Sequence, residues 1–301
     1  MQSENQFIDI PLLAEKNISL SIKREDLIHP IISGNKYRKL KYNLLHSTKK
    51  GFKKLLTYGG AFSNHILAVA AAGKENGLDT IGVIRGDELE EKWELNPTLA
   101  LAKNLGMCFK FVSREQYRQK GDDRFVETLK KEFGNFYVIP EGGTNALAIK
   151  GCEEILSDED SGFGIIASCV GTGGTLAGLI NSSAPNQEIL GFSALKGNFL
   201  SDEIRQMTIK ENWSIQTNYH FGGYGKVSET LVHFINNFKR ETRIPLDPIY
   251  TGKMIFGLLD MIKNDNFAPG TRILAIHTGG LQGIAGMNKV LKKKKLPLLH
   301  I

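Results

Sequence analysis

The chain has 301 residues, of which 41% are hydrophobic and 23% are charged, and its formal net charge is +6. This length and composition exclude a small disulfide-stapled scaffold and a disordered chain, and they predict one large domain or two cooperating domains. The basic excess favours anionic small molecules or a weak attraction to nucleic acid, but lysine runs such as residues 292–295 are typical of a solvated surface.

Apolar runs of strand length alternate with stretches of helical period along the chain. A helix is predicted from Lys36 onward, because Tyr37, Leu40 and Leu44 fall on one face. Alternation of this kind is typical of an α/β fold with mostly parallel sheets that are covered by helices on both faces. About nine or ten strands fit this length, so we expect two cores, with a division near residues 145–155. The clearest strands are predicted at residues 54–58, 80–84, 108–112, 136–139, 164–170, 188–193 and 272–277.

Glycine is the one residue type in clear excess. The chain has 32 glycines, about 11% against an average near 7%. They follow the carboxyl ends of predicted strands at residues 59–60, 142–143, 171–174 and 279–280. In parallel α/β sheets, ligands bind outside these strand ends, and glycine lets backbone N–H groups approach an anion at a helix N-terminus. The glycine positions therefore predict one shared anion site.

The loop at residues 171–175 is the most informative of these turns. It reads Gly-Thr-Gly-Gly-Thr and connects a predicted strand to a predicted helix, which fits either a tight turn or a phosphate cradle with several N–H and hydroxyl donors. Its glycines are out of register for a dinucleotide fingerprint, no acidic ribose ligand follows the next strand, and no Walker A sequence is present. If the loop binds phosphate, the cofactor is smaller than a dinucleotide.

Several classes of partner are not expected. Residues 1–9 are polar, and no run of about 18 apolar residues occurs, so we expect a cytoplasmic protein without a membrane segment. Cys108, Cys152 and Cys169 are odd in number and lack C-x-x-C spacing, which argues against a disulfide framework and a metal site. The basic residues are not interleaved with aromatic ones, so no nucleic-acid partner is expected.

Five motifs occur together in one order along nearly the whole chain. They are Ser-Gly-Asn-Lys-Tyr-Arg-Lys-Leu at residues 33–40, Ser-Asn-His at 63–65, the loop at 171–175, Tyr-Thr-Gly-Lys at 250–253 and His-Thr-Gly-Gly at 277–280. With them the chain resembles pyridoxal-phosphate enzymes of the tryptophan synthase β type (fold type II). Within that group it is most similar to the family of D-cysteine desulfhydrase and 1-aminocyclopropane-1-carboxylate deaminase.

The resemblance implies a fold and an assembly. It implies two three-layer α/β domains with mostly parallel sheets and with pyridoxal 5'-phosphate in the cleft between them. Residues 1–43 and 153–301 would form the large cofactor-binding domain, and residues 44–152 the small domain. A homodimer is expected from the resemblance alone.

The resemblance also implies roles for particular residues. Lys36 matches the lysine to which the cofactor is covalently attached, and Asn64 matches the asparagine that bonds its phenolic oxygen. Thr278 matches the threonine beside its pyridine nitrogen. The match to the phosphate loop comprises Gly171, Thr172, Gly173, Gly174 and Thr175.

Three further residues match catalytic positions of the family. Ser63 matches a serine near the substrate carboxylate, and Tyr224 and Tyr250 match two active-site tyrosines. Taken alone, Ser63 fits a helix cap, Asn64 a turn, and both tyrosines fit core aromatics. A lysine in a site that lowers its pKa acts as nucleophile and base, and a phenol acts as a proton donor.

Two departures from the family pattern bear on the reaction. Thr251 stands where the ring-opening deaminases have a glutamate at the pyridine nitrogen, and Phe62 replaces a glutamine. A neutral Thr278 at that nitrogen favours elimination, so we expect β-elimination from D-cysteine or a similar D-amino acid to pyruvate, ammonia and sulfide. The alternative is opening of 1-aminocyclopropane-1-carboxylate to 2-oxobutanoate and ammonia. A non-enzymatic basic binding protein is the remote alternative.

Overall fold

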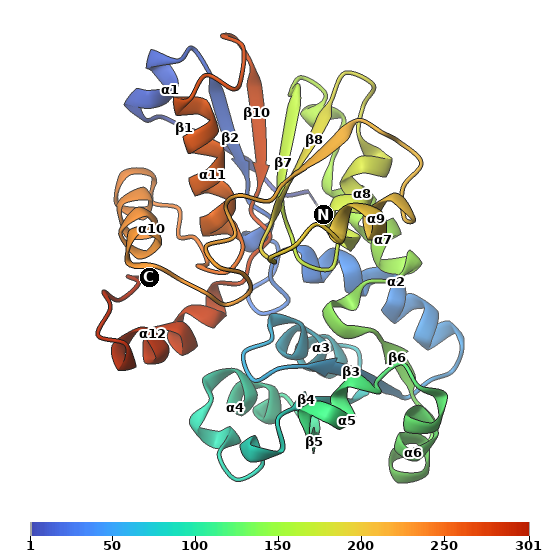
Figure 1. Cartoon of the computed structure of the whole chain (residues 1–301). Coiled ribbons are helices and arrows are strands. Elements are labelled where there is room, and N and C mark those ends of the chain that lie inside the picture. Colours follow the sequence, from blue (N-terminus) through green and yellow to red (C-terminus); the bar gives the residue numbers. More distant parts are fainter. Residues whose placement is uncertain (1, 301) are drawn as a thin grey trace.

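The computed structural model describes residues 2–300 and contains two separate β-sheets (Figure 1). The larger sheet has the strand order β1-β2-β10-β7-β8-β9, and all of its neighbouring strands are parallel except β1 and β2. Its strands are β1 (Asn5–Ile8), β2 (Ser19–Lys23), β7 (Ile165–Val170), β8 (Glu188–Ser193), β9 (Trp213–Gln216) and β10 (Arg272–Ile276).

Helices cover both faces of this larger sheet (Figure 1). One core joins Ala167 and Leu190 to α10 and α11, and the other joins Ile166 and Ile189 to α8 and α9. Successive side chains of one strand thus enter opposite cores, as the pleat of a strand requires. The helices that belong with this sheet are α1 (Pro11–Glu15), α8 (Gly174–Ser182), α9 (Leu200–Arg205), α10 (Glu229–Thr242), α11 (Thr251–Lys263) and α12 (Ile284–Lys293).

The smaller sheet is entirely parallel and has the order β5-β4-β3-β6. Leu55 and Ile84 pack in a core with α3 and α4, while Leu56 and Val83 pack in another with α5 and α6. This sheet is therefore also the middle of three layers. Its elements are β3 (Lys54–Gly59), α3 (Asn64–Glu75), β4 (Asp79–Arg85), α4 (Pro97–Asn104), β5 (Cys108–Val112), α5 (Arg114–Arg118), α6 (Asp123–Phe133) and β6 (Tyr137–Ile139).

Two helices, α2 (Asn35–Lys49) and α7 (Ala146–Cys152), lie between the sheets (Figure 1). They pack closely, because a Cβ atom on Gly151 would lie 2.0 Å from the carbonyl oxygen of Arg38. In the same way α7 approaches α8, where a Cβ on Gly178 would lie 2.5 Å from Cβ of Cys152. Small residues thus let the helices that join the two sheets come into backbone contact.

The expected α/β fold with mostly parallel sheets is confirmed, and all seven predicted strands are present. Strands β1, β2 and β9 were not predicted from the sequence. Strand β2 was not predicted because it ends in Lys23, and a charged residue is not expected at a buried strand position. Lys23 is buried because it pairs with the buried Asp160 at 2.8 Å. The division at residues 43/44 stays a prediction, and it falls inside α2. Within residues 2–300 no helix is both long and apolar enough to cross a membrane.

Candidate active site

A cavity of about 950 Å³ lies between the two sheets. Its walls come from the carboxyl ends of strands in both sheets: Gly60 follows β3, Arg85 ends β4, Gly171 follows β7 and Thr278 lies just beyond β10. The glycine-rich turns of the sequence therefore meet at one place. The predicted site residues that line this cavity are Lys36, Ser63, Asn64, Gly171, Thr172, Gly173, Thr175, Tyr224, Tyr250 and Thr278.

Gly174 is the predicted site residue that lies behind the wall. It begins α8, and a Cβ there would meet Cγ2 of Thr144 at 2.7 Å. Because Gly174 has no side chain, the loop at residues 171–175 can pack closely against Thr144. Gly174 thus helps to position the loop and does not line the cavity itself.

Lys36 is the second residue of α2, and the turn before it is fixed by contact with the backbone beyond β10. Gly34 has φ +65°, and a Cβ there would lie 2.0 Å from the carbonyl oxygen of Thr278. The N–H of Asn35 donates to that same oxygen at 3.3 Å. The lysine is thereby held next to the turn that carries Thr278.

The amine of Lys36 lies in a position that lowers its basicity. Its Nζ donates to the carbonyl oxygen of Gly142 at 3.2 Å. Burial and then the neighbouring charge of Lys39 lower the pKa of Lys36 to about 7. A large share of the amine is therefore unprotonated near neutral pH, as a nucleophile or base requires.

Lys39 is a second cavity lysine that the sequence reading missed. It is 2% exposed, and its Nζ donates to the carbonyl oxygen of Gly142 at 3.2 Å and to Oγ1 of Thr144 at 2.9 Å. Residues three apart on a helix share a face. The spacing from Lys36 was therefore the signal that would have found Lys39.

Ser63 and Asn64 lie at the N-terminus of α3. Ser63 is the N-cap, and its Oγ accepts a hydrogen bond from the N–H of Ile66 at 3.3 Å. The side-chain oxygen of Asn64 is buried and has no partner among residues 2–300. A buried polar atom without a partner at a cavity wall is a place where a ligand supplies the missing group.

The loop at residues 171–175 is shaped as an anion cradle. Gly173 has φ +78°, and a Cβ on Gly171 would lie 3.0 Å from the hydroxyl of Tyr250, so both positions favour glycine. Thr172 and Thr175 line the cavity, and Oγ1 of Thr175 accepts from Nδ2 of Asn35 at 2.8 Å. The loop leads directly into α8, whose first turn carries no acidic residue. An anion is stabilised at such a helix N-terminus.

The side chain of Thr278 contacts an uncharged group. Its Oγ1 is 3.0 Å from Sγ of Cys169. Burial raises the pKa of Cys169 to about 12, so this thiol stays protonated. Thr251, which stands in place of the glutamate of the ring-opening deaminases, is fully buried, and its hydroxyl donates to the carboxylate of Asp247 at 2.7 Å. Thr251 is the first residue of α11 and is not among the residues that line the cavity, so it has no direct contact through which to select the substrate.

Tyr224 and Tyr250 face each other across one side of the cavity. Their ring centroids are 6.1 Å apart in an edge-on arrangement. Burial is the main reason why the pKa of each phenol lies above its usual value. Both hydroxyls are therefore protonated at neutral pH and available as hydrogen-bond or proton donors.

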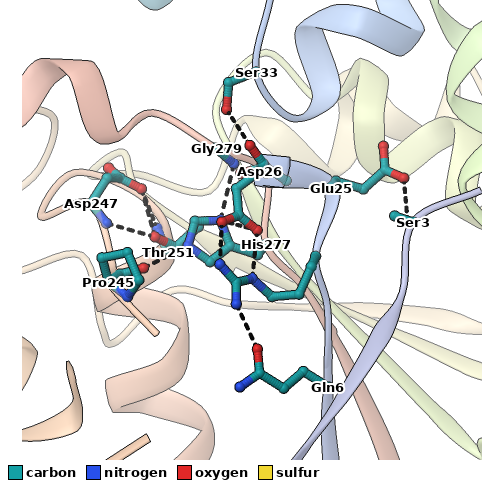
Figure 2. A network of polar contacts seen from close by, with 12 residues as sticks. Ser3, Gln6, Glu25, Asp26, Ser33, Pro245, Asp247, Thr251, His277 and Gly279 are labelled. Carbon is teal, nitrogen blue, oxygen red and sulfur yellow. Dashed lines mark hydrogen bonds and ion pairs between the residues drawn. The ribbon is translucent and has the colours of Figure 1, made fainter. Parts of the chain in front are cut away.

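A polar network supports the Thr278 turn from behind (Figure 2). Nδ1 of His277 accepts from the N–H of Gly279 at 3.2 Å, and its Nε2 lies 2.8 Å from the carbonyl oxygen of Pro245. Nε2 therefore acts as the donor and Nδ1 as the acceptor in these two contacts, and Nδ1 also lies 3.5 Å from Oδ1 of Asp26. Arg24 holds the nearby Asp26 by two hydrogen bonds of 2.9 and 2.7 Å. His277 is thus a positioning residue of the turn, outside the cavity wall.

The geometry as a whole defines an α/β enzyme with a lysine amine and an anion cradle in an interdomain cavity. A family model described as "Pyridoxal-phosphate dependent enzyme" matches residues 4–279. The chain belongs to this family, and its cofactor is pyridoxal phosphate. The prediction of an enzyme is confirmed, so the alternative of a non-enzymatic basic binding protein is not retained.

Known relatives cover most of the chain. A putative 1-aminocyclopropane-1-carboxylate deaminase of Pyrococcus horikoshii is 33% identical over 87% of this chain and 84% of the relative. A mitochondrial bifunctional D-cysteine desulfhydrase/1-aminocyclopropane-1-carboxylate deaminase of Arabidopsis thaliana is 30% identical over 88% of this chain and 73% of the relative. The solved structure of an ACC deaminase homologue superposes with a TM-score of 0.82 at 29% identity, over 97% of this chain and 94% of the other. The resemblance identified from the motifs is thereby confirmed.

The cavity residues fit this cofactor. The loop at residues 171–175 offers N–H groups to a phosphate, Asn64 has a buried oxygen without a partner, and Lys36 provides an amine of lowered pKa. No group of three or more His, Cys, Asp or Glu side chains in residues 2–300 is arranged to hold a metal ion.

Proposed function

We propose that the protein catalyses β-elimination from a small D-amino acid, with D-cysteine or a close analogue giving pyruvate, ammonia and sulfide. The observation that carries the proposal is the 3.0 Å contact between Oγ1 of Thr278 and Sγ of Cys169. Both groups in this contact are uncharged, whereas a carboxylate in the place of Thr278 would hold the pyridine nitrogen of the cofactor protonated. Elimination of a good leaving group depends least on that protonation.

We assign the residues of the chain as follows. Lys36 carries the cofactor and, once released by the substrate, takes the proton from the substrate α-carbon. The α-carboxylate lies at Ser63, on the N-terminus of α3, and Asn64 bonds the cofactor oxygen. The phenols of Tyr224 and Tyr250 donate at the leaving group. When bound, pyridoxal phosphate supplies the electron sink for breaking bonds at the α-carbon.

We also propose the arrangement inferred from the family pattern. Residues 1–43 with 153–301 form the cofactor-binding domain, residues 44–152 form the small domain, and the protein acts as a homodimer in the cytoplasm. Size-exclusion chromatography with light scattering tests the dimer, because a monomeric mass at micromolar concentration would contradict it.

The reaction is tested by incubating holoenzyme with D-cysteine and with β-chloro-D-alanine and measuring pyruvate. We expect turnover of at least one of them, abolished by Lys36→Ala and retained by Lys41→Ala, which alters an exposed lysine of the same helix paired with Glu154. Turnover of neither substrate by wild-type holoenzyme would contradict the proposal. Formation of 2-oxobutanoate from 1-aminocyclopropane-1-carboxylate, without elimination, would establish the ring-opening alternative.

A further inference from the structure

We propose that Arg85 selects a substrate whose β-substituent carries a negatively charged oxygen group, such as a phosphate or sulfate ester. This inference rests on the proposed β-elimination and specifies its leaving group. Arg85 is the last residue of β4, and its side chain lines the cavity from the smaller sheet. It lies beside the turn that leads to Ser63, since a Cβ on Gly60 would be 3.5 Å from Nη2 of Arg85.

The charge of Arg85 is not neutralised by a neighbouring carboxylate. Each carboxylate in the cavity wall is already engaged, because Glu88 pairs with Arg114 and Glu141 pairs with Lys120 at 3.2 Å. The third, Asp247, accepts from the backbone N–H groups that begin α11. Within residues 2–300 no acidic side chain forms an ion pair with Arg85. A guanidinium in this position is available for an anionic ligand.

The side chain of Arg85 is exposed, and its guanidinium lies near an aromatic ring. Its guanidinium carbon lies 5.6 Å from the ring centroid of Tyr117, a geometry that favours a cation over the ring. Tyr117 is 3% exposed and lines the same cavity, and the carboxylate of Glu141 lies close enough to its hydroxyl to contribute, after burial, to a raised pKa of the phenol. The ring of Tyr117 therefore supports the guanidinium of Arg85 at the cavity wall.

Arg85 faces the end of the cavity where the leaving group is expected. Partial burial raises the pKa of Tyr224, and the charge of Arg85 lies close enough to oppose part of that rise. Tyr224 comes from the other side of the cavity and lies beside Tyr250. A β-substituent between Arg85 and Tyr224 would have its α-carboxylate directed toward Ser63.

The size of the cavity agrees with a substituent larger than a thiol. Its volume of about 950 Å³ is near the upper end of the range of about 300–1,000 Å³ for ligand pockets. A tetrahedral oxyanion on the β-carbon would reach Arg85 and accept from its guanidinium in bidentate fashion.

With O-phospho-D-serine as substrate, the proposed β-elimination accounts for every atom and proton. The α-proton passes to Lys36, the bond between the β-carbon and the ester oxygen breaks, and its electron pair leaves with the phosphate. One water hydrolyses the released enamine, so phosphoserine and water give pyruvate, ammonium and hydrogen phosphate. The departing phosphate takes one proton from a phenol at the leaving group and becomes hydrogen phosphate, the proton held by Lys36 restores that phenol, and the positive charge of Arg85 stabilises the negative charge of the departing group.

The test compares an anionic and a neutral leaving group. Holoenzyme is assayed for pyruvate with O-phospho-D-serine and with β-chloro-D-alanine, as wild type, Arg85→Gln and Arg240→Gln. The last variant removes an exposed charge on α10, outside the cavity. We expect Arg85→Gln to lower kcat/KM for phosphoserine about 10- to 100-fold more than for chloroalanine, as loss of hydrogen bonds to a charged group predicts. Arg240→Gln should change neither value.

The outcomes separate the inference from the proposed function. If chloroalanine is turned over but phosphoserine is not, or if Arg85→Gln lowers both values equally, the assignment of Arg85 to the β-substituent is wrong. An equal loss of kcat/KM for both substrates would indicate that Arg85 binds the α-carboxylate instead.

If neither compound is turned over, the proposed elimination is wrong, and the role of Arg85 is then tested by ligand binding. Calorimetry with D-2-amino-3-phosphonopropanoate, which cannot eliminate phosphate, should then show weaker binding to Arg85→Gln than to wild type. Equal binding would overturn the inference.

Discussion

The reactivity of Lys36 depends on a neighbour one helical turn away. Lys39 shares the carbonyl oxygen of Gly142 with Lys36, and its charge is the second cause, after burial, that lowers the pKa of Lys36 to about 7. Below this pH the amine of Lys36 binds a proton and loses its nucleophilicity. We predict that the Lys39→Met substitution moves the pKa of Lys36 upward. Competitive acetylation of cofactor-free protein at a series of pH values, read by mass spectrometry of the Lys36 peptide, measures the midpoint.

Lys41→Met is the control for this measurement. It removes a lysine from the same helix, but Lys41 is exposed and paired with Glu154. The midpoint for Lys36 should lie near pH 7 in this variant, as in wild type. A wild-type midpoint near the ordinary value for lysine would show that burial does not lower the basicity of Lys36.

At the scale of elements, the start of α2 depends on one glycine. Gly34 has φ +65°, and a Cβ there would lie 2.0 Å from the carbonyl oxygen of Thr278. Gly34→Ala should therefore lose more stability than the about 1–2 kcal/mol that the left-handed region alone costs other residues. Gly51 is the matched control, with φ +77° and no atom within 4 Å of the added Cβ. Urea unfolding of Gly34→Ala and Gly51→Ala compares the two, and equal losses would contradict the close contact.

Strand β2 depends on a buried ion pair. Lys23 and Asp160 are 2.8 Å apart, and their side chains are 2% and 1% exposed. We predict that Lys23→Met destabilises the protein by about 3–5 kcal/mol, because it leaves a buried carboxylate without its counter-charge. Lys16→Met breaks the exposed pair with Asp265 and should cost about 0–1 kcal/mol. Similar midpoints in thermal unfolding would contradict this difference.

The buried Lys23–Asp160 pair illustrates which parts of the fold and the site could be predicted from the sequence. Strands with continuous apolar residues, such as β3 and β7, and the glycine turns that follow them were visible, because burial on both faces leaves a local pattern. Lys23, Lys39 and Arg85 were not visible as site or core residues. Their partners lie far away in the chain: Asp160 is 137 positions from Lys23, Gly142 is 103 positions from Lys39, and Tyr117 is 32 positions from Arg85. Only the fold brings such partners together.

At the scale of the whole molecule, the two sheets also meet on the side away from α2 and α7. The ring of Phe62 lies on Gly286 of α12, where an added Cβ would be 2.4 Å from Cδ1 of the ring. Nearby, Nζ of Lys289 donates to the carbonyl oxygen of Leu95 at 2.7 Å. Phe62 and Gly286 both line the cavity. The unusual aromatic residue before Ser63 thus closes one wall by joining the two halves of the molecule.

Gly286→Val tests whether this contact sets the width of the cavity. The added side chain must displace the ring of Phe62, which is 41% exposed and can turn toward solvent. We predict that kcat/KM for β-chloro-D-alanine falls about 10- to 100-fold, since misplacement of reacting groups by about 1 Å has an effect of this size. Removing the ring makes room for the valine, so the double variant Phe62→Ala/Gly286→Val should recover much of the loss. If the two substitutions instead act additively on kcat/KM, Phe62 and Gly286 are not coupled and the wall is set elsewhere.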